Sequence, residues 1–282
     1  MSRGGACLVV PPRGIPAPAG LLIVNADDWG RDRLTTDRTL DCVRRGAISS
    51  VSAMVFTEDS ERAAAIAKEE RIEVGLHLNL TTPFSAAGCP GRLVQRQQQV
   101  ARYLRSHRLS QAIFHPGLTR AFEYVVAAEL DEFRRLYGAD PDRLDGHHHM
   151  HLCANVLLAS LLPRGTMVRR SFSFQVGEKS LGNVVYRRLV DRVLARRHCL
   201  ADFFFSLAPL TPSSRLPRIV ELARRFVVEV ETHPSDPDEY QFLSGGDLLS
   251  RIGDVPIMPP STVARPGRLG GGRPGAPGAI RR

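Results

Sequence analysis

The stretch LLIVNADDWG (residues 21–30) decides the fold class, because it reads as an apolar β-strand that ends in two adjacent acids. A helix is expected directly after it, over residues 34–48, with Thr35 or Thr36 near its cap and Gly46 at its end. Strand-like and helix-like segments go on alternating for about 240 residues. This alternation favours parallel strands with helical crossovers, closed or nearly closed as a barrel.

Later segments fit the same pattern. The strands expected further along the chain cover residues 48–56, 71–80, 143–152, 201–209 and 225–236. The expected helices cover 60–70 and 120–141, and the second has the clearest apolar repeat at helical spacing. Residues 81–118 are rich in Gly, Gln and Arg, and we expect them to form an insertion over one face. Because the carboxyl ends of the strands gather on one face in β/α folds, residues at those ends should meet in space.

The charge balance is basic. Lys and Arg (38) outnumber Asp and Glu (29), which gives a formal net charge of +9 and suits an anionic partner, either a nucleic acid or a membrane surface. No basic motif is interleaved with aromatic residues, so we favour an arginine-rich solvated surface and expect no specific nucleic-acid partner. The five cysteines form no C-x-x-C pair, which argues against a disulfide scaffold or zinc knuckle and predicts a cytoplasmic protein.

The two ends of the chain differ in composition from the rest. Residues 1–20 carry a short apolar patch broken by prolines, which we interpret as a flexible lead-in and not as a signal peptide. Residues 259–282 are rich in Pro, Gly and Arg, which predicts a disordered tail. Residues 21–258 are the predicted single domain, and no apolar run approaches the ~20 residues of a transmembrane segment.

Four of the nine histidines lie within the stretch RLDGHHHMHL (143–152). On a strand, His147, His149 and His151 would share one face. His147 is the best metal-ligand candidate, because Gly146 before it would let an ion approach the backbone. The other two histidines could hold ring orientation through hydrogen bonds. The alternative is that the cluster forms only a polar rim at a strand end.

Asp27 and Asp28 are the second sequence feature that indicates a metal site. Two adjacent acids after a buried apolar run are costly unless a cation, a proton or strong donors compensate. At a strand end the two carboxylates point in different directions, so one can bind a metal while the other faces a bound water. Taken alone, the pair could equally cap the following helix. With Asp145 beside the histidine cluster, we favour a metal site.

Two further histidines are candidate site residues only because of their predicted positions near strand ends. His77 is a lone histidine in the apolar stretch VGLHLNL, where a core residue is the more common finding. Its predicted place at the same barrel mouth makes it a candidate ligand. His233 precedes a proline that fixes the chain at the exit of a strand, and taken alone it is a weak candidate.

Five motifs follow one another in this order: LLIVNADDWG, GAISSVSAMV, VGLHLNLT, DRLDGHHHMHL and VETHPSD. Their order and spacing resemble the YdjC-like carbohydrate deacetylases, which include chitooligosaccharide deacetylase and hopanoid-biosynthesis-associated relatives. The resemblance covers residues from about 21 to 250. Each motif alone is weak, but the ordered set is highly specific.

The resemblance implies a distorted β/α-barrel related to polysaccharide deacetylases, with one divalent ion, Mg²⁺ or Zn²⁺, as cofactor. The implied ligands are Asp28, His77 and His147, and Asp27 is the implied base. His233 would, as a protonated imidazole, donate a proton to the departing amine.

The sequence departs from the family pattern just after the acids. Trp29 stands where the family usually has phenylalanine, at a position that we expect to line the site. Arg31, Arg33 and Asp37 follow where family members commonly have a Gly-rich turn, which alters the mouth of the site.

These observations predict a metal-assisted hydrolase that removes an N-acetyl group from a small acetylated sugar. One alternative is another metal-dependent hydrolase, such as a phosphoesterase, which would need two ions and more acidic ligands. Another is a basic binding protein without catalytic activity, including a family member that has lost its activity. The assembly state is open, and a homodimer is one option.

Overall fold

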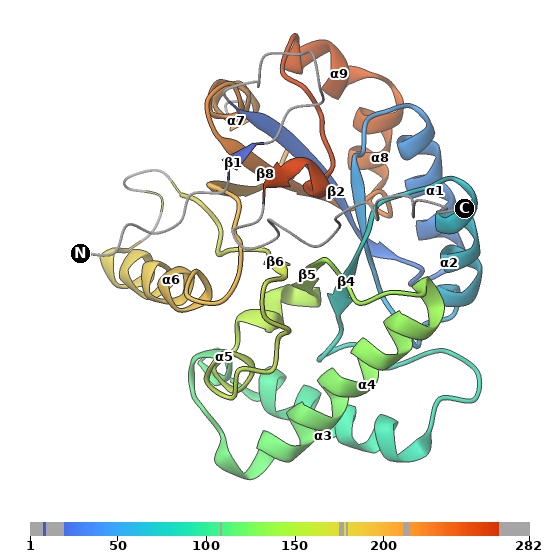
Figure 1. The fold of residues 1–282 in the computed structure, drawn as a ribbon, viewed down its shortest axis with the longest axis vertical. Helices are drawn as coiled ribbons and strands as arrows, with labels where there is room; N and C mark the ends of the chain where they lie inside the picture. The colour runs from blue at the N-terminus through green and yellow to red at the C-terminus, as the bar shows by residue number, and fades with distance from the viewer. Residues whose placement is uncertain are drawn as a thin grey trace, which may run out of the picture.

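The computed structural model describes residues 8–9, 20–107, 109–174, 178, 180–210 and 215–264. A seven-stranded sheet in the order β6-β5-β4-β3-β2-β8-β7 runs through its centre, and every neighbouring pair is parallel. Figure 1 shows the sheet curled like part of a barrel, with helices around it. Its strands are β2 (Leu21–Trp29), β3 (Ser50–Ala53), β4 (Val74–Leu78), β5 (Arg143–Gly146), β6 (Met167–Val168), β7 (Phe203–Ser206) and β8 (Val227–Thr232).

Helices connect these strands and cover the outside of the sheet. They are α1 (Arg33–Arg44), α2 (Ser60–Glu69), α3 (Gly91–Ser106), α4 (Thr119–Tyr137), α5 (Ala154–Leu158), α6 (Leu181–Leu194), α7 (Arg215–Ala223), α8 (Pro237–Ser244) and α9 (Asp247–Ile252). Short 3-10 turns lie at η1 (Ser110–Ala112), η2 (Pro116–Leu118), η3 (His147–Leu152) and η4 (Pro260–Thr262). The predicted α/β-barrel class is therefore confirmed.

The barrel nearly closes between its two edge strands. The Val168 amide at the end of β6 donates to the Cys199 carbonyl at 2.9 Å. Further along, the Ser173 amide donates to the Phe204 carbonyl of β7 at 2.8 Å. These bonds link the segment after β6 to β7 and the chain before it, so polar side chains inside the curve are shielded from water.

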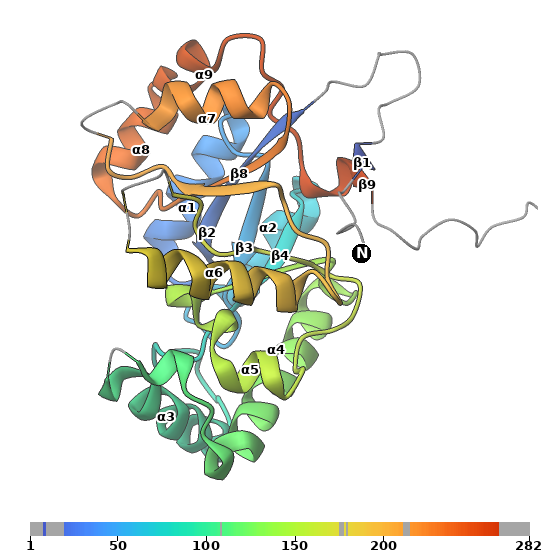
Figure 2. The ribbon, with the colours of Figure 1, turned by 90° about the vertical axis from the view of Figure 1, so that its left-hand side faces the viewer.

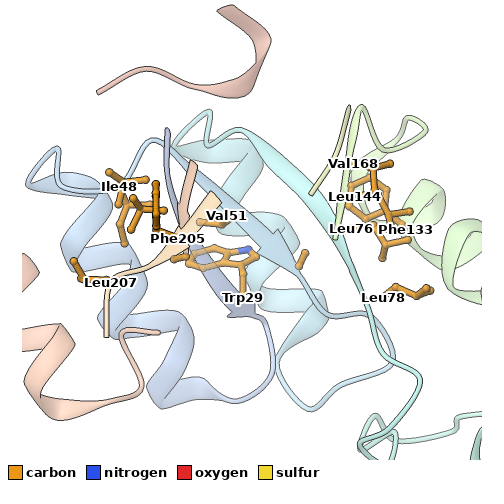
Figure 3. Close-up of a cluster of buried hydrophobic side chains, with 14 of the residues drawn as sticks. Trp29, Ile48, Val51, Leu76, Leu78, Phe133, Leu144, Val168, Phe205 and Leu207 are labelled. Atoms are coloured by element: carbon orange, nitrogen blue, oxygen red, sulfur yellow. The ribbon is translucent and has the colours of Figure 1, made fainter. Parts of the chain in front are cut away.

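A continuous hydrophobic core holds the helices on the sheet. Figure 3 shows two groups of its side chains, one around Trp29 and Val51 and another where Leu76, Leu144 and Phe133 meet. All five are buried. Burial of large apolar side chains is the main favourable term in folding, so this core fixes the frame on which the strand ends are placed.

Residues 81–118, which were predicted to form an insertion over one face, are largely helical and not a loose stretch. They contain α3, η1 and η2, and α3 packs against α4. Leu93, Val100 and Leu104 are buried at helical spacing on α3. The Gln and Arg content that suggested a loop is compatible with a helix, because both residues have high helix propensity.

Two local predictions also need correction. Helix α1 is capped by Asp32, whose carboxylate accepts from the Thr35 amide at 2.8 Å, and not by Thr35 or Thr36. The predicted strand 143–152 ends at Gly146, where the chain turns into η3. The sequence also gave no signal for β6, a strand of two residues.

The terminal segments are described only in part. Leu8–Val9 (β1) pairs antiparallel with Val263–Ala264 (β9), and η4 lies just before β9. The rest of the predicted lead-in up to residue 19, and the predicted tail from residue 265, lie outside the described residues. No helix in the described part of the chain combines the length and the apolar character that crossing a membrane requires.

The packing of α4 gives a direct test of this core. Phe122→Ala should lower the free energy of unfolding by about 3–5 kcal/mol, because it removes a fully buried ring and leaves a cavity. Tyr124→Ala on the exposed side of the same helix should cost less than about 1 kcal/mol. Urea denaturation of both variants measures the difference, and equal losses would contradict this orientation of α4.

Candidate active site

Three candidate metal ligands meet where β2, β4 and β5 end. Asp28, His77 and His147 each offer one ligand atom, and these atoms all lie within 4.8 Å of one another. The Asp28 Oδ1 atom is 2.9 Å from His147 Nδ1 and 3.3 Å from His77 Nε2. The fold therefore brings together three side chains that are distant in sequence, as the strand-end argument predicted.

The backbone at Asp28 leaves the extended conformation. Its φ is +64°, and the register between β2 and β3 shifts between Ala26 and Trp29. Consecutive side chains on a regular strand point to opposite faces, so Asp27 and Asp28 could not both serve one site there. The left-handed residue allows both carboxylates to reach it.

The histidine cluster is not arranged as predicted. His148 and His149 have φ values of +54° and +58°, so the chain turns sharply after Gly146 and the strand-like alternation of the histidines is wrong. Only His147 among them contacts Asp28. The ring of His151 packs over Gly146, where an added Cβ would lie 3.0 Å from His151 Nδ1. The absence of a side chain at Gly146 thus lets His151 pack against the backbone there.

Asp145 fixes the orientation of His77. The Asp145 Oδ1 atom lies 2.7 Å from His77 Nδ1, which leaves His77 Nε2 directed toward Asp28. A carboxylate on the outer nitrogen is the usual way in which a metal-binding histidine is oriented. Burial alone would lower the pKa of His77, but Asp27 and Asp145 outweigh it and raise that pKa to about 10.

Asp27 is held by an arginine that the sequence analysis did not identify. Arg169 Nη1 and Nη2 donate to the two Asp27 oxygens at 2.6 and 2.7 Å. Asn25 Nδ2 donates to Oδ1 at 2.8 Å. Burial would raise the pKa of Asp27, but the Arg169 charge reverses this and leaves the pKa below its ordinary value. Asp27 is therefore ionised at neutral pH.

His233 lies near Asp27 and next to Glu239. Its Nε2 atom is 3.9 Å from Asp27 Oδ2, and its Nδ1 atom is 3.9 Å from Glu239 Oε1. The same Glu239 accepts from the His233 amide at 2.8 Å. Burial on its own would lower the pKa of His233, but the interactions with Glu239 and Asp27 raise it to about 9.

The family model described as "YdjC-like protein" matches residues 21–254. The chain belongs to the YdjC-like family. The resemblance carried by the five ordered motifs is confirmed, and the match lies within the predicted domain of residues 21–258.

Several curated relatives match about half of this YdjC-like chain. It is 32% identical over 135 residues to the chitooligosaccharide deacetylase of Proteus mirabilis, covering 48% of the chain and 51% of the relative. It is 34% identical over 137 residues to that of Enterobacter sp., covering 47% and 50%. The carbohydrate deacetylase of Danio rerio is 29% identical over 146 residues, covering 50% and 45%. The chain thus spans about half the length of the curated relatives it matches.

A solved structure shares the fold. A protein of Enterococcus faecalis, described as a candidate cellobiose-phosphate cleavage protein, superposes with a TM-score of 0.59. The match covers 84% of the YdjC-like chain and 95% of that protein, at 18% identity. At this identity the likeness concerns the fold alone.

The most important group missed in the sequence is a cluster of buried charges beneath the site. We call it the buried charge cluster, and it holds two guanidinium groups among four carboxylates. Its members are Asp27, Arg143, Asp145, Arg169, Glu229 and Glu231. Arg169 contacts Asp145 at 2.8 Å, Glu229 at 2.6 Å and Glu231 at 3.2 Å. The sequence signal was present in VVEVET, where two acids alternate with valines on a buried strand.

Of the residues that depart from the family pattern, only Arg31 contacts the candidate ligands. Arg31 Nη1 lies 2.6 Å from Asp28 Oδ2, and Arg31 Nε lies 2.9 Å from Asp32. Asp28 therefore presents Oδ1 alone to the two histidines. Arg33 and Asp37 lie on the exposed side of α1, and Arg33 Nε is 4.0 Å from Asp37 Oδ2.

Trp29, His149 and His151 make their contacts outside the group of three candidate ligands. Trp29 is fully buried in the core, so it does not line the site as predicted. His149 packs edge-on against Phe172 with ring centroids 4.6 Å apart, and His151 Nε2 lies 3.0 Å from the Arg169 carbonyl. These two histidines support the surrounding structure, and their sequence spacing alone did not distinguish them from His147.

A second group of three potential ligands shares a residue with the first. Asp27, His77 and Asp145 also lie close enough to hold an ion. Both of these carboxylates are already paired with Arg169, and His77 belongs to both groups. The described residues therefore support one metal centre, which disfavours chemistry that requires two ions.

A cavity of about 190 Å³ adjoins the site. His148 and His149 line one side of it, and Phe172, Tyr186 and Arg187 line another. A larger cavity of about 350 Å³ lies at the opposite ends of the strands, where β3, β4 and β5 begin, and is remote from these side chains. Of these two cavities the smaller lies nearer the candidate ligands, because His148 lines it and the ring centroids of His148 and His147 are 4.0 Å apart.

The buried charge cluster predicts a strong dependence of stability on Arg169. Arg169→Met should lower the free energy of unfolding by about 3–5 kcal/mol at neutral pH, because the carboxylates around it lose their partner. The loss should shrink at low pH, where those carboxylates can be protonated. Arg134→Met, which removes an exposed ion pair, should leave the urea midpoint unchanged. A similar midpoint for both variants would show that the cluster is not held by Arg169.

Proposed function

We propose that this chain is a metal-dependent carbohydrate deacetylase, which hydrolyses the N-acetyl group of an acetylated sugar or oligosaccharide and releases acetate. The observation that carries the proposal is the convergence of Asp28, His77 and His147 beside an ionised Asp27, which has His233 3.9 Å away. Family membership and the names of the curated relatives support the substrate class.

The donor set fits a divalent cation. Two imidazoles and one carboxylate are typical of catalytic zinc sites, in which further positions stay open. The Asp145 contact holds His77 in the tautomer that a metal ligand needs. Asp28 and the two histidines would hold the ion, and the identity of the ion, Mg²⁺ or Zn²⁺, is left to experiment. When bound, a divalent ion supplies Lewis acidity toward the acetyl carbonyl and lowers the pKa of water.

Asp27 would act as the base. Its carboxylate accepts a proton from the attacking water as the oxygen of that water adds to the acetyl carbon. The paired hydrogen bonds from Arg169 lower its basicity but fix its direction. That fixed direction is useful, because proton transfer requires the base to lie within hydrogen-bond reach of the water.

His233 would act as the acid. Its raised pKa keeps the imidazole protonated at neutral pH, so it can donate to the amide nitrogen as the carbon–nitrogen bond breaks. The proton gained by Asp27 and the proton lost by His233 balance the addition of water across the amide. The products are acetate and the free amino sugar.

The sugar would occupy the cavity beside His148 and His149. Phe172 and Tyr186 offer aromatic surface there, and Arg187 offers hydrogen-bond donors. His148 lines this cavity, and its ring centroid lies 4.0 Å from that of the candidate ligand His147.

Metal removal tests the reaction. After treatment with a chelator, acetate release from N-acetylglucosamine oligosaccharides should stop, and Zn²⁺, Mg²⁺, Mn²⁺ or Co²⁺ added singly should show which ion restores it. His77→Ala should bind less metal and show no rescue, whereas the exposed His107→Ala should behave like the unaltered protein. Asp27→Asn should keep the metal and lose about 10²–10⁴-fold in kcat. Full turnover of the Asp27→Asn protein would remove Asp27 as the proton acceptor.

The acid role of His233 predicts a pH profile. Because its pKa is raised to about 9, the protonated form needed for catalysis is present below that pH and is lost above it. Glu239→Gln removes one charge that raises this pKa, so the alkaline limb of kcat/KM should move to lower pH. The acidic limb should stay in place. An unmoved alkaline limb would mean that His233 is not the group that titrates there.

A further inference from the structure

One helix of the fold carries an exposed apolar stripe. Leu181, Val185 and Leu189 recur every four residues on α6, and their side chains are 85%, 64% and 56% exposed. Residues four apart lie on the same side of a helix, so the three side chains form one continuous row. The opposite side of α6 is buried through Val190 and Leu194, which pack into the core. We call the exposed row the outer face of α6.

Arginines flank this row. Arg188 and Arg192 are exposed on α6, and Arg196 is exposed just after its end. No carboxylate of the described residues lies within ion-pair distance of these three. The acid of the helix, Asp191, is turned inward, where Arg170 Nη2 contacts it at 2.7 Å. The outer face therefore combines apolar side chains with positive charge alone.

The outer face lies beside the candidate substrate cavity. Figure 2 shows α6 lying lengthwise on the outside of the molecule, with no other labelled helix or strand in front of it. Tyr186 of α6 and Gln111 of η1 both line the cavity. Next to η1, Leu109 and Ile113 are 58% and 55% exposed. Exposed apolar side chains thus occur on two segments that border the same cavity.

We propose that the outer face of α6 docks on an anionic lipid bilayer. Basic amphipathic helices bind at the lipid interface with their apolar side chains at the boundary between headgroups and acyl chains. Arginines near such a surface add electrostatic attraction to the anionic headgroups. The net charge of +9 for the whole chain acts in the same direction.

Two other anionic or apolar partners fit less well. A second copy of the chain would bring two sets of arginines together, and like charges across an interface are costly. A nucleic acid would pair with the arginines but would leave Leu181 and Val185 in water. A lipid surface satisfies both the charge and the apolar row. This docking holds the cavity near the membrane surface, and it does not depend on the proposed deacetylase activity.

Vesicle sedimentation of the full chain tests the proposal. The protein should bind vesicles of phosphatidylcholine with phosphatidylglycerol, bind pure phosphatidylcholine weakly, and lose binding as salt rises. Leu189→Asp/Arg192→Glu should reduce the partition coefficient by about tenfold or more. Leu249→Asp/Arg225→Glu makes the same change in formal charge on exposed residues of α9 and the end of α7, and should bind like the unaltered protein.

Val185→Asp/Arg188→Glu repeats the test on the next turn of α6, and circular dichroism checks that each variant is folded. Three results would each overturn the proposal. One is absence of binding to the anionic vesicles. Another is an equal loss in the α6 and control variants. The third is a dimer, seen by light scattering, that the α6 variants convert to monomer, because the outer face would then be an interface between copies.

Discussion

The guanidinium of Arg169 allows four carboxylates to point into one side of the curled sheet. Asp27, Asp145, Glu229 and Glu231 are all buried there, and Arg169 contacts every one of them. Buried charges are tolerated only when they are paired and hydrogen-bonded. The near closure of the barrel removes water from this region, so these carboxylates depend on the arginine and not on solvent. The contacts that orient the candidate ligand His77 and those that orient the candidate base Asp27 both start from Arg169.

In one series of contacts Arg169 pairs with Asp145, which in turn contacts His77. In the other, Arg169 pairs with Asp27, which lies 3.9 Å from His233. The orientation of the candidate ligand and that of the candidate base are therefore coupled through a single side chain. The same carboxylates raise the pKa of His77, so a proton and a divalent cation compete for its Nε2 atom. Because a ligand imidazole must be neutral, cation binding here would release a proton and would weaken at low pH.

The sequence predicted the parts of this arrangement that follow from local patterns. Apolar runs ending in Asp27–Asp28 and a lone His77 marked strand ends, and parallel topology placed those ends together. Arg169 follows a two-residue strand in MVRRS, where no periodicity separates it from an ordinary surface arginine. The turn at His148 could not be predicted either, because its left-handed backbone depends on tertiary packing around Gly146 and not on a glycine of its own.

Half of the left-handed non-glycine residues in the described part of the chain lie in or next to the candidate site. In the described part of the chain six non-glycine residues have left-handed φ, and Asp28, His148 and His149 are three of them. Each such residue costs on the order of 1–3 kcal/mol and persists only when its surroundings enforce it. A regular strand would send the neighbouring side chains of Asp27 and Asp28 to opposite faces, so both acids could not lie around one site. The departures from regular strand geometry at Asp28 and after Gly146 are therefore the local cost of assembling the site, and the buried core and the Arg169 pairs supply the stability that offsets it.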